Sequence, residues 1–320
     1  MYKILRFFNQ NKKNIIKVIL IVTFILGLIQ LFNFWAGNKN VINNESSNFI
    51  ASNNISNKLE DKIISNKSAI TGDTIDSKQL EENGNIINNF MTFCNDNDIE
   101  AAYNLISDDC KKEMYPTEKE FYTKYYKNIF NNNTIIYSIE NWFDDTYKVE
   151  MSEDILVTGN SSKGNKNLDY ITIVETDNGK KLNINSFVGK EEINKDSKNN
   201  NINVTVIEKT IYMDYEIYKL KVQNNTNNKI CLDTKETTNS IYLENNKNAK
   251  FYSIINEIED DTLIIGEKYT NEIEIKFNVP YSSNNKIKDM IFEKVILDYK
   301  QYISSDKEEY NDYYILKIEL

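Results

Sequence analysis

The side chains of this 320-residue chain that could do chemistry are carboxylates, lysines, tyrosines and three cysteines. Histidine is absent, and the single arginine, Arg6, lies close to the N-terminus. Histidine is the commonest general base near neutral pH and the commonest metal ligand, and arginine is the usual bidentate clamp for phosphate. The sequence therefore excludes serine-hydrolase triads, histidine-based zinc sites and arginine-lined phosphate sites. We predict that the protein is not an enzyme, and the alternative is an enzyme that uses tyrosine, lysine or carboxylates.

Three clusters of carboxylates offer the oxygen ligands that hard cations prefer. We interpret the first cluster as helix caps, because a calcium loop needs more oxygens and a glycine at its bend. The second is interpreted as a solvated turn, and the third as a solubilising loop with a weak cation site as its alternative. The clusters are Asp96, Asp98 and Glu100; Asp108, Asp109 and Glu113; and Glu257, Glu259, Asp260 and Asp261. We predict no metal and no cofactor.

The cysteines Cys94, Cys110 and Cys231 are odd in number, so they cannot all pair within the chain. Cys94 and Cys110 fall in one predicted domain. There they either form a disulfide or serve as two small buried hydrophobes, which is the more common role of a free cysteine.

Charge is divided unevenly along the chain. The first 40 residues carry +6 and the whole chain −10, so the remainder carries −16. Neutralisation of phosphates by basic residues supplies most of the affinity of proteins for nucleic acids. An acidic part without arginine is poorly suited to that task, and we predict no nucleic-acid partner.

The segment Val18–Ala36 reads VILIVTFILGLIQLFNFWA and holds no charged residue. As a helix it would be about 28 Å long, close to the ~30 Å hydrocarbon core of a bilayer. Five cations precede it and one follows, so the positive-inside rule places the N-terminus in the cytoplasm and the rest outside. A cleaved signal peptide fits less well, because the apolar stretch is longer than ~15 residues and lacks a suitable cleavage site. The predicted anchor residues are Val18, Ile25, Leu28, Leu31 and Trp35.

Composition then divides the chain into five parts: a basic cytoplasmic segment (1–17), a transmembrane helix (18–36), a flexible linker (37–78) and two folded domains (79–192 and 201–320). The linker is predicted from its Asn, Ser, Lys and Asp content and from its lack of any sustained period.

The first folded domain begins with helices and continues with strands. An apolar stripe at helical spacing marks the first helix (Ile86, Ile87, Phe90, Met91 and Cys94). Capping boxes open the next two helices, Asn97 with Glu100 and Thr117 with Glu120. Four β-branched and aromatic runs follow, Thr134–Phe143, Thr146–Gly159, Asp169–Thr176 and Lys180–Phe187. The expected fold class of this domain is α+β, with three helices on one face of a curved antiparallel sheet.

The second folded domain is predicted to consist of strands throughout. Ile273, Ile275, Phe277 and Val279 alternate with polar residues, which is typical of a strand with one wet face. Seven or eight such strands fit an all-β sandwich.

The order of helices and strands in the first domain, with the phrase DIEAAYNLISDDCKKEMYPTEKEF (Asp98–Phe121), resembles the nuclear transport factor 2-like superfamily, a cone-shaped α+β fold. The second domain resembles the immunoglobulin-like domains of Gram-positive envelope proteins through LKVQNNTNNKICL (Leu220–Leu232) and KFNVP (Lys276–Pro280). Enzymes of the first family often use an Asp–His pair, which this chain lacks. The resemblance implies a non-catalytic binding or assembly module, similar in arrangement to single-helix subunits of secretion and conjugation machines.

The resemblance also implies a pocket at the open end of the cone. We predict that six aromatic residues line it, and the alternative is that their rings fill the core. The six are Tyr103, Tyr122, Tyr125, Tyr126, Trp142 and Phe143. The function predicted is a non-enzymatic, single-pass, membrane-anchored extracytoplasmic protein that binds an envelope partner. The alternative is a small-molecule sensor or carrier that uses the cone pocket. The oligomeric state stays open.

Overall fold

The structure is a computed structural model that describes Leu59 and residues 62–131, 133–153, 166–198, 201–236, 239–282 and 285–320. The predicted membrane span Val18–Ala36 and all five of its anchor residues lie outside this range, as does the predicted linker up to residue 58. Within the described range, no helix has both the length and the apolar character needed to cross a bilayer.

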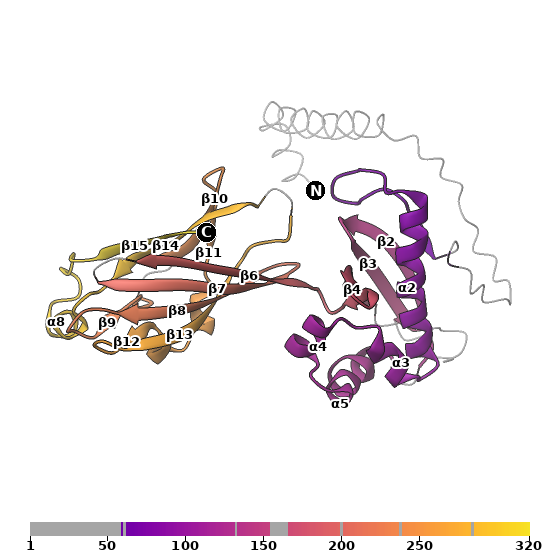
Figure 1. Ribbon diagram of the computed structural model, residues 1–320, viewed down its shortest axis with the longest axis horizontal. Coiled ribbons are helices and arrows are strands. Elements are labelled where there is room, and N and C mark those ends of the chain that lie inside the picture. Colours follow the sequence, from indigo (N-terminus) through magenta and orange to yellow (C-terminus); the bar gives the residue numbers. More distant parts are fainter. Residues whose placement is uncertain are drawn as a thin grey trace, which may run out of the picture. The chain divides into compact units, whose positions relative to one another are not determined.

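Helices follow the short strand β1 (Ile63–Ser65) in the first block (Figure 1). Side-chain oxygens of Asp76, Asp98, Ser107 and Thr117 accept hydrogen bonds from first-turn N–H groups and so begin the first four. The predicted cap at Thr117 is confirmed, whereas Asp98 replaces Asn97 as the second cap. Asn97 has a φ of 59° and lies in the turn before the helix. The elements are α2 (Ser77–Asn95), α3 (Ile99–Asn104), α4 (Asp108–Met114), α5 (Glu118–Phe121), the π-helical turn η2 (Tyr122–Tyr126) and α6 (Lys127–Ile129).

A five-stranded sheet completes the first block, in the order β1-β2-β3-β4-β5. Neighbouring strands are antiparallel except for β1, which pairs parallel with β2. Four of the strands occupy the four predicted runs, and β1 comes from the end of the segment predicted to be linker. The strands are β1 (Ile63–Ser65), β2 (Ile135–Phe143), β3 (Thr146–Glu153), β4 (Asn167–Thr176) and β5 (Gly179–Asn183).

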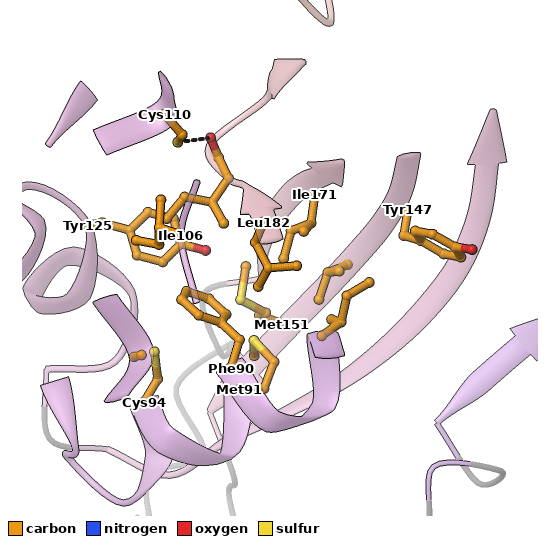
Figure 2. Packing of buried hydrophobic residues seen from close by; sticks show 14 of the residues in the cluster. Phe90, Met91, Cys94, Ile106, Cys110, Tyr125, Tyr147, Met151, Ile171 and Leu182 are labelled. Carbon is orange, nitrogen blue, oxygen red and sulfur yellow. Dashed lines mark hydrogen bonds between the residues drawn. The ribbon is translucent and has the colours of Figure 1, made fainter. Parts of the chain in front are cut away.

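The apolar face of α2 packs on one face of this sheet. Phe90, Met91 and Cys94 on α2 belong to the same buried cluster as Ile171 on β4 and Leu182 on β5, and Figure 2 shows their side chains converging. The helical stripe predicted from the sequence is therefore the stripe that forms the core.

The second block consists of two four-stranded sheets and a short ribbon. One sheet has the order β13-β8-β7-β6 and the other β11-β10-β14-β15, while β12 pairs with β9. Short helical elements η3 (Ile255–Glu257), η4 (Asp260–Leu263) and α8 (Tyr299–Ser304) connect the strands. The strands are β6 (Phe187–Lys198), β7 (Ile202–Tyr212), β8 (Glu216–Asn224), β9 (Ile230–Cys231), β10 (Ile241–Asn245), β11 (Lys250–Tyr252), β12 (Ile264–Ile265), β13 (Thr270–Phe277), β14 (Ile287–Val295) and β15 (Tyr314–Glu319).

The two four-stranded sheets share one core. Leu220 on β8 and Ile275 on β13 belong to the same buried cluster as Leu243 on β10, Met290 on β14 and Leu316 on β15. Alternation along β13 explains this, because its odd-numbered residues from Ile273 to Phe277 are buried and its glutamates are exposed.

The expected fold class, α+β, is wrong. The described chain is mostly β-structure, and α2 is the one helix in it longer than seven residues. The physical reason lies in the short helices. Leu105 and Tyr115 end α3 and α4 after six and seven residues, while β6 and β7 extend over 12 and 11 residues.

Candidate functional site

An open groove of about 680 Å³ lies beside the start of α2. Its walls are the loop 68–76, the first turn of α2, the β2–β3 turn and part of β4, together with Val188 and Tyr281. This volume falls within the range of about 300–1,000 Å³ that is usual for small-molecule sites.

The loop that forms one wall is fastened to β2 through its backbone. Ala69 N–H donates to the Asn141 carbonyl at 2.9 Å, and the Ser68 hydroxyl donates to the Trp142 carbonyl. Gly72 has a φ of 74°, a left-handed conformation that glycine adopts without strain and that lets the loop turn back. Residues 68–76, which the sequence analysis assigned to a flexible linker, are therefore an ordered part of the site.

The start of α2 places two of the carboxylates. Asp76 caps the helix by accepting hydrogen bonds from Lys78 N–H at 3.1 Å and Gln79 N–H at 3.3 Å. The Gln79 side-chain amide in turn donates to Asp145 Oδ1 at 3.0 Å, and the Asn83 amide donates to the same oxygen at 3.2 Å. The two amides hold Asp145 in place and leave its second oxygen available as an acceptor.

The β2–β3 turn places a third carboxylate next to an aromatic pair. Asp144 has a φ of 47°, a conformation that Asp and Asn tolerate better than other side chains. Its Oδ2 accepts a hydrogen bond from the Tyr281 hydroxyl at 3.4 Å, and the Tyr281 ring packs edge-on against Phe143 with centroids 5.4 Å apart. Burial first, and then the charges of Asp144 and Asp145, raise the pKa of Tyr281 to about 12.

Asn141 supplies a buried acceptor on the floor of the groove. The residue lines the groove and is only 3% exposed. Its Oδ1 has no hydrogen-bond partner within the part of the chain that the structure describes. An unpaired buried acceptor costs about 1–3 kcal/mol, so such a group marks a place where a donor is expected to bind.

The electrostatic character of the groove is acidic. Asp73, Asp76, Asp144 and Asp145 all line it, and no lysine is present among the described residues of its walls. A carboxylate accepts hydrogen bonds without donating any. The groove is thus arranged to bind groups that carry positive charge and donate hydrogen bonds.

The six aromatic residues predicted to form a pocket do not come together at this groove, where Phe143 is the one that contributes to the lining. Tyr125 and Tyr126 are 2% and 1% exposed and belong to the core. Tyr122 stacks on Tyr126 with centroids 5.5 Å apart. Tyr103 packs on Phe121 in the core cluster, and Trp142 packs on Tyr170 in another cluster.

Tyr125 has a structural partner in Asp169. Its hydroxyl donates to Asp169 Oδ2 at 2.7 Å, and the carboxylate also accepts the N–H groups of Asn185 and Ser186, each at 3.0 Å. Asn185 and Ser186 have φ values of 58° and 62°, so the carboxylate stabilises a strained turn between β5 and β6. Burial raises the pKa of Asp169 despite these hydrogen bonds.

The acidic clusters singled out in the sequence take roles in capping and on the surface. Asp98 caps α3 through Ala101 N–H at 3.1 Å, and Asp108 and Asp109 lie exposed in the first turn of α4. Glu257 and Glu259 border a second hollow of about 420 Å³, in which Lys219 pairs with Glu272 at 3.3 Å. Nowhere in the described ranges do three His, Cys, Asp or Glu side chains lie close enough to hold a metal ion.

The cysteines are free and buried. Cys94 and Cys110 therefore do not form the disulfide that was one of their two expected roles. Burial raises the pKa of Cys110 and Cys231 to about 12, and it raises that of Cys94 as well. These thiols are therefore protonated at neutral pH and are poor nucleophiles.

The groove residues Asp73, Asp76, Asn141, Asp144 and Asp145 escaped the sequence analysis as a site. The signals present were local ones, namely a turn at Asp144–Asp145 and a polar Asn141 within a strand. No known protein family, curated protein or solved structure matches this chain. The resemblances stated above consequently stay predictions.

Proposed function

We propose that this protein is a non-catalytic binding protein of the cell envelope, anchored through residues 18–36 with both folded blocks outside the cytoplasm. The cations that flank the apolar stretch support the orientation. The observation that carries the binding role is the acidic groove, in which Asp145 is held by two amides and Asn141 presents a buried, unpaired acceptor. Such fixed polar groups reduce the cost of ordering the site when a ligand binds.

The placement of the reactive groups supports a role without catalysis. The described thiols are buried and have raised pKa values, and the Asp169 carboxylate is enclosed by hydrogen bonds from Tyr125, Asn185 and Ser186. Asp169 is only 3% exposed, so substrate could not reach it without displacing the core. The thiols and Asp169 thus serve to stabilise the fold.

An envelope protein is the ligand that we favour, and assembly into a larger envelope apparatus such as a secretion or conjugation machine is the sharper form of the proposal. A membrane anchor places the folded blocks among other envelope components. A small-molecule sensor or carrier is the second candidate. The observation that favours it is the groove volume of about 680 Å³, which would accommodate a small ligand.

The test is site-specific photocrosslinking of the full-length protein in intact cells. A photoreactive residue at Thr71, on the exposed rim of the groove, is compared with one at Lys247, an exposed position in the β10–β11 turn. The proposal predicts one stoichiometric envelope protein attached at Thr71 and none at Lys247. Equal capture at both positions would show that the groove is not the specific binding surface. Capture of no protein at either would shift the assignment to the small-molecule alternative.

The orientation has a separate test. Protease added to intact, wall-stripped cells should digest the chain after Asn40, and full protection of that part would refute the extracytoplasmic placement.

A further inference from the structure

We infer that the groove binds aliphatic primary ammonium groups, as found in lysine side chains and in linear polyamines. The inference rests on the proposed function, because it assigns a ligand chemistry to the same groove.

The first argument is the match between donors and acceptors. The lining offers four carboxylates, the unpaired Asn141 Oδ1 and threonine hydroxyls, but no cationic side chain within the described walls. An ammonium group has three N–H donors and no acceptor, so it complements such a lining. A neutral ligand would leave the carboxylates without a counter-charge, and an anion would be repelled by them.

The second argument is the spacing of the carboxylates. Calcium needs six to eight oxygens converging at 2.3–2.6 Å, which are typical distances for that ion. In the described part of the chain no three acidic side chains are placed closely enough for this, and the aspartates come from different walls of the groove. Dispersed charges fit a ligand whose positive groups are themselves separated by a flexible chain.

The third argument is the apolar surface between the charges. Phe143 and Tyr281 form an edge-on pair, and Ile173, Val174 and Val188 also line the groove. Methylene chains between ammonium groups can cover such surface while the charged ends reach the carboxylates, as lysine side chains do at protein surfaces. The combination distinguishes an alkylammonium from a compact inorganic cation.

The test is isothermal titration calorimetry on the full-length protein in a non-ionic detergent at about 0.15 M salt. Spermine and an acetylated tri-lysine amide are the two probes. Binding of spermine alone identifies a free polyamine as the source of the ammonium groups, and preferential binding of the peptide identifies a protein partner. Either result supports the inference, whereas absence of binding by both probes would overturn it.

Three variants localise the binding. Asp144→Asn removes one charge, and asparagine tolerates the left-handed conformation of this turn as aspartate does. Affinity should therefore fall about two- to fivefold. Asn141→Leu removes the buried acceptor and should lower affinity about tenfold, with the unfolding transition checked to show that the fold is kept. Asp177→Asn is the matched control, because Asp177 is an exposed aspartate in the β4–β5 turn outside the groove.

Equal losses from Asp144→Asn and Asp177→Asn would overturn the inference, because they would show attraction to net charge alone. Tight one-to-one calcium binding that displaces spermine would also overturn it in favour of a metal site. Failure of the ligand class and failure of the proposed function give different results. If the photoreactive residue at position 71 still captures an envelope protein when neither ammonium probe binds, the ligand class is wrong and the binding role stands. If no protein is captured and spermine binds, the groove takes a small ligand.

Discussion

Tyr125 and Tyr122 lie three residues apart and were both predicted to bind a ligand, but the structure gives them different environments. Tyr125 is 2% exposed and donates its hydroxyl to Asp169, whereas Tyr122 is 37% exposed. Replacing each by phenylalanine removes one hydroxyl and keeps the ring. We expect Tyr125→Phe to destabilise the protein and Tyr122→Phe to change its stability very little.

The magnitude follows from the surroundings of Asp169. A hydrogen bond to a charged group contributes about 1.5–3 kcal/mol. The carboxylate keeps the N–H groups of Asn185 and Ser186 in the variant, so it is not left without partners. We therefore expect a loss of about 2 kcal/mol for Tyr125→Phe at neutral pH, within the lower part of that range. For Tyr122→Phe we expect a change within about 0.5 kcal/mol, as is usual for surface substitutions.

The assay is urea unfolding of the full-length protein in non-ionic detergent, followed by near-ultraviolet circular dichroism. With an m-value of about 3 kcal/mol/M, a loss of 2 kcal/mol lowers the midpoint by about 0.7 M. The loss should shrink on acidification. The Tyr125 hydrogen bond stabilises the ionised carboxylate, and a protonated Asp169 would lose only a neutral hydrogen bond.

Two results would refute this reasoning. Equal midpoints for the two variants would show that the Tyr125–Asp169 contact contributes nothing to folding. A loss for Tyr125→Phe that stays the same from about pH 7 down to the unfolded-state pKa of about 3.9 would show that the charge of Asp169 is not what the hydroxyl stabilises.

Three further predictions concern other parts of the fold. Because burial raises the pKa of Asp169 in the folded state, wild-type stability should increase relative to Asp169→Asn as the pH falls from about 7 toward the unfolded-state pKa of about 3.9, and urea midpoints across that range would show it. A Cβ at Gly84 would lie 3.1 Å from Leu59 and 3.3 Å from Ile63, so Gly84→Val should displace that segment, cost about 1–3 kcal/mol and expose Lys62 to trypsin. Gly189→Val, at a position with open space around it, is the control, and equal trypsin sensitivity of the two variants would contradict the packing argument. Iodoacetamide should leave all three cysteines unmodified in the folded protein and label them in urea, and mass spectrometry showing rapid labelling of folded Cys110 would disprove its burial.

The elements that the sequence predicted correctly are those whose signals are local. The α2 stripe from Ile86 to Cys94 repeats within three helical turns, and the cap at Thr117 depends on residues three apart. The β1 segment gave no such signal, because Ile63–Ser65 is three residues long and its partner Ile139 lies far along the chain. Pairing of so short a strand depends on tertiary packing, here of Leu59 and Ile63 over Gly84, which no local pattern reveals.

The number of helices was mispredicted for a related reason. Periodic apolar residues predicted three helices, yet α4 intervenes and the third helix passes through a π-helical turn at Tyr122–Tyr126. Side chains in that turn are divided between the core and the surface, since Tyr125 and Tyr126 are buried and Tyr122 is exposed. A stripe of tyrosines shows that a helix has a buried face, but it does not show whether a cavity lies beside it.

One part of the candidate site could have been inferred from strand geometry alone. Successive residues of a strand point to opposite faces, so Trp142 and Phe143 are expected on opposite faces of β2. Asn141 and Phe143 share a face, and both line the groove, while Trp142 packs on Tyr170. A polar residue at an inward position, three residues before an Asp-Asp turn, is a local conflict between pattern and burial. Such conflicts are expected at functional sites, and here the conflict coincides with the one buried side-chain acceptor that lacks a partner in the groove walls that the structure describes.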